Sequence, residues 1–189
     1  NQTFETVINS SDEVITIDGY KYDSADKDTL TIGTGENVIN LYYTKRTDLS
    51  YTVNYLEKDT NTVLHTPETK TGVTFATVIN PKDEEIGIDG YKYDSASPEK
   101  LTIVTDNSKN VINLYYTKRT DLSYTVNYLD KSTGEAIINA KIENNQTFGT
   151  VIKSEKEKIA IDGYNYDSAD KAELTIVTDN SKNVINLYY

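Results

Sequence analysis

The sequence predicts a mainly β protein in which small modules follow one another as a tandem array, and three observations carry this prediction. Short phrases recur along the chain, which is typical of repeat architectures. Apolar and polar residues alternate in short runs rich in Val, Ile, Thr and Tyr, which is the pattern of β-strands. Segments rich in Asp, Asn, Ser and Gly separate these runs, and such residues favour turns.

Three phrases define the repeat. Asp-Gly-Tyr-x-Tyr-Asp-Ser-Ala occurs at residues 18–25, 89–96 and 162–169. Asn-Val-Ile-Asn-Leu-Tyr-Tyr occurs at residues 37–43, 110–116 and 183–189. Thr-Lys-Arg-Thr-Asp-Leu-Ser-Tyr-Thr-Val-Asn-Tyr-Leu occurs at residues 44–56 and 117–129. We therefore predict a partial first repeat that lacks its N-terminal strands, followed by two full repeats, with the boundaries 1–46, 47–119 and 120–189.

The first half of the third repeat predicts a hairpin. Residues 124–129 alternate as a strand, whose one face carries Tyr124, Val126 and Tyr128. A turn around Gly134 leads into a second predicted strand at residues 136–142, because glycine readily adopts the positive φ that many turns need.

A short helix is predicted after the hairpin, at residues 147–152. Thr147 would cap its first turn, and the apolar residues that follow have the i, i+3, i+4 spacing of a helix face. The same pattern follows Thr3 in the first repeat. Beyond the helix, Tyr164 and Tyr166 alternate on one face of a further predicted strand.

Two more strands are predicted near the end of the repeat, at residues 174–177 and 183–189. The closing strand would carry Ile185, Leu187 and Tyr189 on one face and Val184, Asn186 and Tyr188 on the other. A hairpin, a short helix and then further strands is the order of a β-grasp-like, ubiquitin-like module. A small all-β sandwich is the alternative.

The linkers between repeats predict an elongated arrangement. Residues 44–50 and 117–123 contain no Gly or Pro, so we expect semi-rigid connections and a rod of repeats. Leu49 or Leu122 could pack at such a joint.

Composition excludes several classes of protein and site. The net charge of −11 disfavours nucleic acid as a partner, because such binding depends on Lys and Arg. No apolar run approaches the roughly 20 residues of a membrane span, so no membrane insertion is expected. The absence of Cys excludes disulfides and thiolate sites. All 16 Tyr belong to the repeated phrases, which favours a modular array over an enzyme, and no catalytic residue, metal or cofactor is predicted.

The phrases resemble the mucin-binding protein (MucBP) type repeat of Gram-positive surface proteins. The resemblance rests on the opening Tyr-Thr-Val-Asn-Tyr with its Thr-Gly-Glu turn, on Asp-Gly-Tyr-x-Tyr and on the closing Asn-Val-Ile-Asn-Leu-Tyr-Tyr. The second repeat departs from it, because residues 57–61 lack the turn glycine. The resemblance implies a β-grasp-like fold, an extracellular, cell-wall-anchored protein and a role in adhesion.

Repeated tyrosines are the candidate ligand-binding residues. Tyrosine rings can stack on sugars, and host mucin or other glycoprotein glycans are the partners that the resemblance implies. The candidates are Tyr20, Tyr22, Tyr91, Tyr93, Tyr164, Tyr166, Tyr42, Tyr115 and Tyr188. The alternative, which we favour, is that most of these rings pack against the core and leave only the hydroxyl in water.

Other polar clusters have ordinary structural explanations. Residues 23–26, 94–97 and 105–110 offer oxygen ligands, but they lack the EF-hand spacing and favour Asx-turns over calcium binding. Residues 83–85 are expected to form a solvated charged face, and His65 a bystander. Isopeptide bonds between a lysine (Lys45 or Lys118) and a nearby asparagine (Asn40 or Asn113) are a further hypothesis by analogy with other surface domains.

The functional expectation is therefore a non-enzymatic segment of a bacterial cell-surface adhesin that acts as an extended stalk or spacer. The alternative is an adhesion module that binds mucin glycans through exposed Tyr side chains, with avidity from repetition. In either case the neighbouring repeats of the same chain are expected partners.

Overall fold

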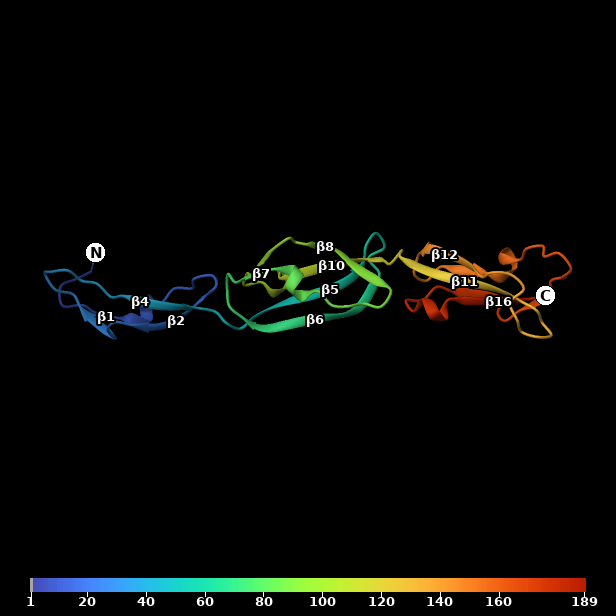
Figure 1. The fold of residues 1–189 in the computed structure, drawn as a ribbon. Coiled ribbons are helices and arrows are strands. Elements are labelled where there is room, and N and C mark those ends of the chain that lie inside the picture. Colours follow the sequence, from blue (N-terminus) through green and yellow to red (C-terminus); the bar gives the residue numbers. More distant parts are fainter. Residues whose placement is uncertain (1) are drawn as a thin grey trace. The chain divides into compact units, whose positions relative to one another are not determined.

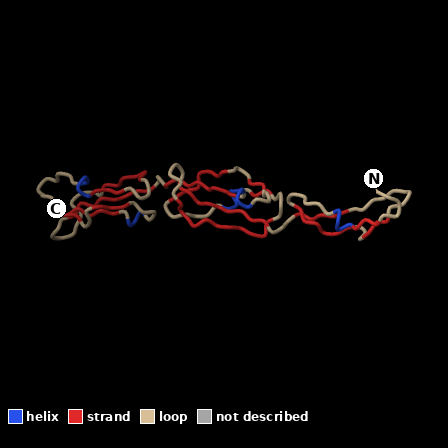
Figure 2. Tube along the Cα trace, turned by 180° about the vertical axis from the view of Figure 1, so that it is seen from behind, coloured by secondary structure: helices blue, strands red, loops and turns tan. Residues whose placement is uncertain are grey.

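The computed structural model describes residues 2–189, and the protein is mainly β (Figures 1 and 2). The described residues form sixteen strands and five short 3₁₀ helices, with no α-helix among them. No helix within residues 2–189 has the length and apolar character needed to cross a membrane.

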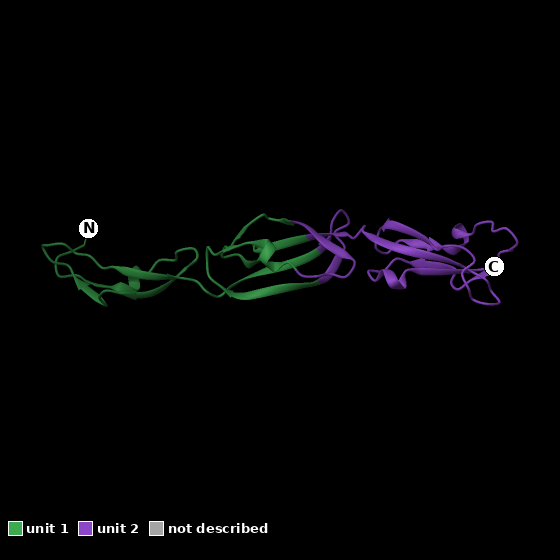
Figure 3. Cartoon of the chain, in the orientation of Figure 1, with its two compact units in different colours: residues 1–55, 66–85, 96–114 green, residues 56–65, 86–95, 115–189 purple. Residues whose placement is uncertain are grey.

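The chain divides into two compact units (Figure 3). One unit contains Asn1–Tyr55, Thr66–Glu85 and Ala96–Leu114, and the other contains Leu56–His65, Ile86–Ser95 and Tyr115–Tyr189. The repeat boundaries 1–46, 47–119 and 120–189 remain a prediction.

The third repeat contains a mixed four-stranded sheet in the order β12-β11-β16-β14, of which Figure 1 labels β12, β11 and β16. Its strands are Lys141–Gln146, Leu122–Leu129, Val184–Tyr188 and Ser168–Ala169. β11 pairs with β12 antiparallel and with β16 parallel, so the first and last long strands of the repeat lie side by side at the centre of the sheet. The predicted closing strand is confirmed, although it is shorter by one residue at each end.

One face of this sheet forms the core, as the alternation predicts. Tyr124, Val126 and Tyr128 are at most 5% exposed, and the residues between them are only half-buried. The same core holds inward residues of β16 and the residue after it, together with two residues in and just after β15, namely Ile185, Leu187, Tyr189, Leu174 and Ile176. Leu122 also lies in this core, at the start of β11.

The predicted helix at residues 147–152 is wrong. Residues 148–149 form a turn in which Gly149 has a φ of +77°, and Val151–Lys153 is strand β13. β13 pairs antiparallel with β15, Glu173–Thr175, in place of the longer strand predicted at residues 174–177. A central glycine and β-branched residues weaken a helix, and the β15 ladder satisfies the backbone groups instead.

The first repeat corrects the same prediction. The residues after Thr3 form a turn that ends in β1, Val7–Asn9, which pairs with β3, Thr29–Thr31.

Two other strand predictions are also displaced in the third repeat. The predicted strand at residues 136–142 starts at Lys141, because β11 finds its backbone partners there, and Tyr164 forms only an isolated bridge with Ile161.

The second repeat has the same architecture in its sheet, with the strand order β6-β5-β10-β8. These strands are Val63–Val73, Leu49–Glu57, Val111–Lys118 and Tyr91–Ser97. A second ladder joins β7, Val78–Ile79, to β9, Leu101–Thr102.

The first repeat has a second two-stranded ladder besides β1-β3. It joins β2, Tyr20–Ala25, to β4, Leu41–Lys45.

Three of the 3₁₀ helices, η1, η2 and η4, each follow a short strand, and the other two, η3 and η5, each precede a closing strand. The five helices are η1 (Ser10–Glu13), η2 (Pro81–Glu84), η3 (Asn107–Lys109), η4 (Ser154–Glu157) and η5 (Asn180–Lys182).

The last residue of η4, Glu157, is buried, and its carboxylate accepts a hydrogen bond from the Tyr124 hydroxyl at 2.9 Å. Lys141 donates to its other oxygen at 2.8 Å. Burial and the hydrogen bond to Glu157 raise the pKa of Tyr124 to about 12.

We predict that the contribution of Tyr124 to stability is lost at alkaline pH. Because its pKa is raised by folding, this contribution is complete below pH 10 and disappears as the pH rises toward 12. Tyr124→Phe should lower the melting temperature at pH 8, and the gap to the wild type should narrow at pH 11. Circular dichroism measures both, and Tyr188→Phe, on the outward face of β16, is the control. A gap that does not depend on pH would contradict the prediction.

Candidate functional site

The Asp-Gly-Tyr phrase forms a corner that receives a phenylalanine from the next repeat. Gly19 and Gly90 are both buried and both have a φ of +78°. A Cβ atom on Gly19 would lie 2.3 Å from the ring of Phe75, and one on Gly90 would lie 2.3 Å from the ring of Phe148. Both the backbone conformation and the close approach of the ring therefore require glycine at these positions.

The tyrosine after each glycine completes the contact. The rings of Tyr20 and Phe75 meet edge to face with centroids 5.9 Å apart, and those of Tyr91 and Phe148 do so at 5.8 Å. This geometry is favourable because the positive edge of one ring meets the negative face of the other.

A linker arginine holds the glycine and the phenylalanine together through its backbone. The Arg46 N–H donates to the carbonyl of Gly19 at 2.9 Å, and the Arg46 carbonyl accepts from the N–H of Phe75 at 2.8 Å. Arg119 makes the same two bonds with Gly90 and Phe148, each at 2.9 Å.

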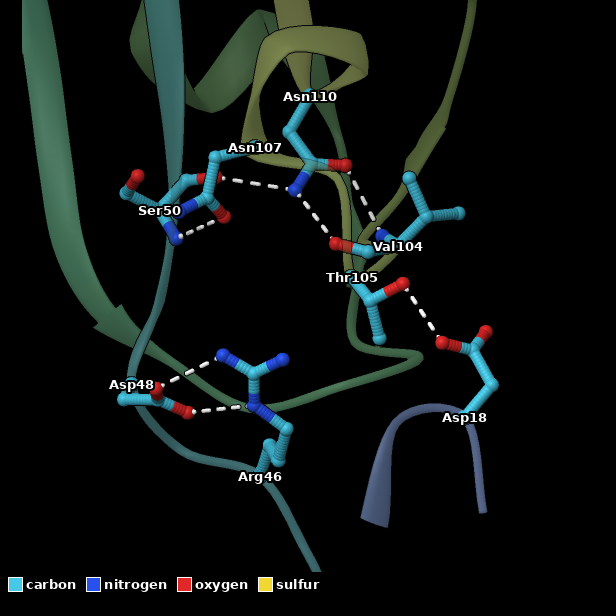
Figure 4. A network of polar contacts seen from close by, with 8 residues as sticks. All are labelled: Asp18, Arg46, Asp48, Ser50, Val104, Thr105, Asn107 and Asn110. Atoms are coloured by element: carbon cyan, nitrogen blue, oxygen red, sulfur yellow. Dashed lines mark hydrogen bonds and ion pairs between the residues drawn. The ribbon is translucent and has the colours of Figure 1, made fainter. Parts of the chain in front are cut away.

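The arginine side chain fixes the linker itself. In Figure 4, the Arg46 guanidinium donates two hydrogen bonds to Asp48, at 3.0 Å to Oδ1 and 2.8 Å to Oδ2. These bonds lower the pKa of Asp48 and raise that of Arg46. Arg119 and Asp121 repeat the pair at the same distances. A bidentate pair specifies direction as well as distance, so it restricts rotation of the linker.

A threonine closes the corner from the other side. The Thr105 hydroxyl donates to Oδ1 of Asp18 at 2.7 Å (Figure 4), and Thr178 donates to Asp89 at 2.8 Å. We call each full set a Gly–Phe joint. The first joint consists of Asp18, Gly19, Tyr20, Arg46, Asp48, Phe75 and Thr105, and the second of Asp89, Gly90, Tyr91, Arg119, Asp121, Phe148 and Thr178.

Two buried and two exposed asparagines anchor the chain where the linker enters the next sheet. The Asn110 side chain donates to the carbonyls of Ser50 and Val104 and accepts from the Val104 N–H (Figure 4). Asn107 accepts from the N–H of Ser50 at 3.0 Å. Asn183 and Asn180 make the equivalent bonds in the third repeat. The linker is thus fixed at both ends.

The first joint lies wholly within one compact unit, and the second joint lies wholly within the other.

The third corner has the same glycine conformation but an open surface. Gly163 also has a φ of +78°, yet a Cβ there would meet nothing within 4 Å, and Tyr164 is 40% exposed. Phe4, the counterpart of Phe75 and Phe148, is 59% exposed.

The nine candidate tyrosines fall into separate environments. Tyr20 and Tyr91 belong to the joints. A second group packs edge to face on the last tyrosine of its own repeat at 5.7–6.0 Å, and its pairs are Tyr22–Tyr43, Tyr93–Tyr116 and Tyr166–Tyr189. Tyr42 is 52% exposed, and Tyr115 and Tyr188 are half-buried on the outward face. Glycan contact by these residues remains a prediction.

The acidic candidates have local roles. Asp26 accepts hydrogen bonds from the backbone and side chain of Asn40, and the backbone bond lowers its pKa. Asp106 caps η3. Within residues 2–189, no three His, Asp or Glu side chains gather as a group that could hold a metal ion.

Glu84 differs from the expected solvated face. It is half-buried and accepts a hydrogen bond from Tyr51 at 2.7 Å, because η2 turns it toward the sheet. His65 is exposed. Lys118 forms an ion pair with Glu57, and Asn113 accepts from Asn54, so each residue of the hypothetical isopeptide pair has another contact.

Sequence reasoning missed the residues of the joint other than tyrosine. The sequence did contain a signal for the joint, because Asp-Gly-Tyr and Arg-Thr-Asp are both repeated without change and the three Phe occupy equivalent positions. Leu122 lies in the core of its own repeat, and Leu49 is fully buried at the start of β5; packing of either residue at the joint stays a prediction.

Comparison with solved structures yields distant similarity only. No family model and no curated protein matches the chain. A solved structure, the type 2 repeat of the mucus binding protein MUB from Lactobacillus reuteri, is 11% identical. The match covers 74% of this chain and 98% of that one, with a TM-score of 0.27. The MucBP family therefore stands as a resemblance of the sequence.

We predict that the joint protects its linker from proteolysis. Trypsin cleaves after Arg119, which the second joint holds through its backbone N–H and carbonyl. Gly90→Ala should displace Phe148 and raise the rate of cleavage there by about tenfold or more, because local opening governs cleavage. Gly163→Ala is a matched control, with the same φ and open space around it. Equal cleavage rates in the two variants would contradict the role of the joint.

Proposed function

We propose that this chain is a non-enzymatic spacer segment of a bacterial cell-surface adhesin, in which the repeats form an extended stalk. The observation that supports it is the Gly–Phe joint, which is built twice from the same residues at nearly the same distances. Flexible linkers have no such contacts and let their domains reorient freely. A joint that fixes each linker at both ends suits a protein whose task is reach.

The module is proposed to be β-grasp-like, without the usual helix. Support comes from the third sheet, in which the opening hairpin is β11-β12 and the closing strand β16 lies parallel to β11. The resemblance of the sequence to MucBP repeats supports an extracellular, wall-attached setting. The acidic charge of −11 suits a surface that does not associate with itself.

The absence of enzymatic activity is part of the proposal. This part of the proposal is supported by the polar residues of the repeated phrases, which recur from repeat to repeat and form contacts in the joints, turns and cores. Asp18, Arg46 and Thr105 have exact counterparts in the second joint, which is the distribution expected of structural residues.

Glycan binding by tyrosine is the second candidate function, and one observation favours it. Tyr42, Tyr115 and Tyr188 lie on the outward faces of β4, β10 and β16, at the same place in each repeat. Such repetition would convert weak contacts with a mucin into avidity.

Small-angle scattering tests the stalk. A repeat of this size has a diameter of about 30 Å, so we predict a maximum dimension on the order of 90 Å for the wild type. A variant with both Gly19→Ala and Gly90→Ala should populate bent arrangements and show a lower radius of gyration, whereas Gly163→Ala should match the wild type. A compact wild type would contradict the proposal.

Binding to immobilised mucin tests the second candidate. Changing Tyr42, Tyr115 and Tyr188 together to Ala should weaken binding by about tenfold or more, because avidity multiplies the loss at each site. The matched control changes the exposed Thr31, Thr102 and Thr175 to Ala. Equal binding by the two variants, or no saturable binding by the wild type, would eliminate glycan contact at these residues.

A further inference from the structure

The first and last long strands of the third repeat form one parallel ladder (Figure 1). β11 begins at Leu122, directly after the linker, and β16 ends at Tyr188. Thr125 lies opposite Val184 near one end of the ladder, and Leu129 lies opposite Tyr188 near the other. The start of β11 and the end of β16 therefore lie at opposite ends of the same ladder.

A pull along the chain loads this ladder in shear. It draws the start of β11 one way and the end of β16 the other way, so the two strands are pulled past each other. The hydrogen bonds of a parallel pair are evenly spaced along the strands, and all of them resist such sliding at the same time. Strands that are peeled apart from one end lose their bonds one after another instead. The direction of the pull therefore decides how much force the ladder withstands.

Tension that arrives through the linker acts on the ladder at once, because the start of β11 is held. Leu122 is fully buried. The N–H of Ser123 donates to Oδ1 of Asn180 at 3.0 Å, and the carbonyl of Ser123 accepts from the side chain of Asn183 at 3.0 Å. Both asparagines lie just before β16, so the first residues of β11 are already tied to the closing strand.

The far end of the ladder is held in the same way. The N–H of Tyr189 donates to the carbonyl of Leu129 at 3.0 Å, and the carbonyl of Tyr189 accepts from the N–H of Lys131 at 2.9 Å. The Tyr189 hydroxyl also exchanges two hydrogen bonds with the backbone of Ile159, each at 3.1 Å. The end of the closing strand is thus fixed by its backbone and by its side chain.

A pair of asparagine side chains bridges the two strands in the middle of the ladder. Asn127 lies opposite Asn186, and its Nδ2 donates to Oδ1 of Asn186 at 2.9 Å. Asp170 holds Asn186 by accepting from its N–H at 2.9 Å and from its Nδ2 at 3.2 Å. A slip of one residue would place the partner side chain on the opposite face, so the bridge also resists sliding. In the second repeat, Asn54 donates to Asn113 at 2.8 Å.

The second repeat has a ladder of the same direction. Its β5 and β10 are neighbours in the sheet. The N–H of Thr52 donates to the carbonyl of Asn110 at 2.9 Å, and the N–H of Lys58 donates to the carbonyl of Tyr116 at 2.8 Å. The residue numbers rise together on both strands, so the strands are parallel. β10 continues through the linker into β11, and a pull on the chain reaches both ladders along the covalent backbone.

We propose that the ladder between the first and last long strands of the second and third repeats is a load-bearing clamp, which keeps a repeat folded while the chain is pulled along its length. In the third repeat the clamp consists of β11, β16 and the bridge from Asn127 to Asn186. This inference rests on the proposed function, because a stalk between a cell and its ligand carries tension.

Single-molecule pulling on the full chain tests the clamp in two directions. The chain has no Cys, so two introduced cysteines are unique attachment points for DNA handles. Thr120→Cys with a cysteine added after Tyr189 loads the ladder in shear. Ser132→Cys with the same added cysteine pulls on one end of the ladder only, and so peels β16 from β11. Thr120 and Ser132 are both exposed.

We expect the shear direction to need at least about twofold more force than the peeling direction at the same pulling speed, because the bonds share the load in one case and break in turn in the other. Unfolding in shear should lengthen the chain by roughly 200 Å as residues 122–189 extend. Both variants contain the same ladder, and equal melting temperatures by circular dichroism would exclude a difference in stability. Equal forces in the two directions would overturn the clamp.

Asn127→Ala tests the bridge. It should lower the force in shear and leave the force in peeling unchanged, because peeling starts at Tyr189 and reaches Asn127 only after other bonds have broken. Asn165→Ala, which changes an exposed asparagine outside the ladder, is the matched control. An equal loss of force in both directions would show that the bridge contributes to stability alone, and would remove it from the clamp.

The clamp and the stalk fail in different measurements. Scattering measures the shape of the unloaded chain, whereas the clamp is measured as a ratio of forces. An extended chain with equal forces in the two directions would overturn the clamp and keep the stalk. A compact chain whose force depends on direction would contradict the stalk and keep the clamp.

Discussion

The parallel pairing between the first and last long strands of a repeat is the interaction on which the module depends. In the third repeat it places β11 and β16 at the centre of the sheet and joins two runs of inward side chains into one core. The same closing sequence is a strand from Val184 but only from Leu41 in the first repeat, where that partner does not lie beside it. Secondary structure in this protein therefore follows the presence of a partner strand.

Buried polar groups give this pairing its precision. Asn183 satisfies the carbonyl of Ser123 in β11 and both the N–H and the carbonyl of Val177, just after β15. The carboxylate of Glu157 accepts hydrogen bonds from Tyr124 and Lys141. A buried polar side chain is stable only when its partners are in place. Each of these residues thus ties a loop to one position over the core.

The joint depends on the absence of a side chain at the corner around Gly19 or Gly90. The ring of Phe75 or Phe148 occupies the space that a Cβ atom would fill there.

The sequence by itself determined the repeat and the inward faces of the long strands, because alternation along a strand is a local property. Tyr124, Val126 and Tyr128 are buried as their spacing predicts. The helix prediction at residues 147–152 failed because its apolar spacing fits a turn followed by a strand equally well, and the pairing of Val151 with Thr175 decided between them. Only the tertiary structure could unite Gly19, Arg46 and Phe75 in a joint, since their contact depends on how the chain folds between them.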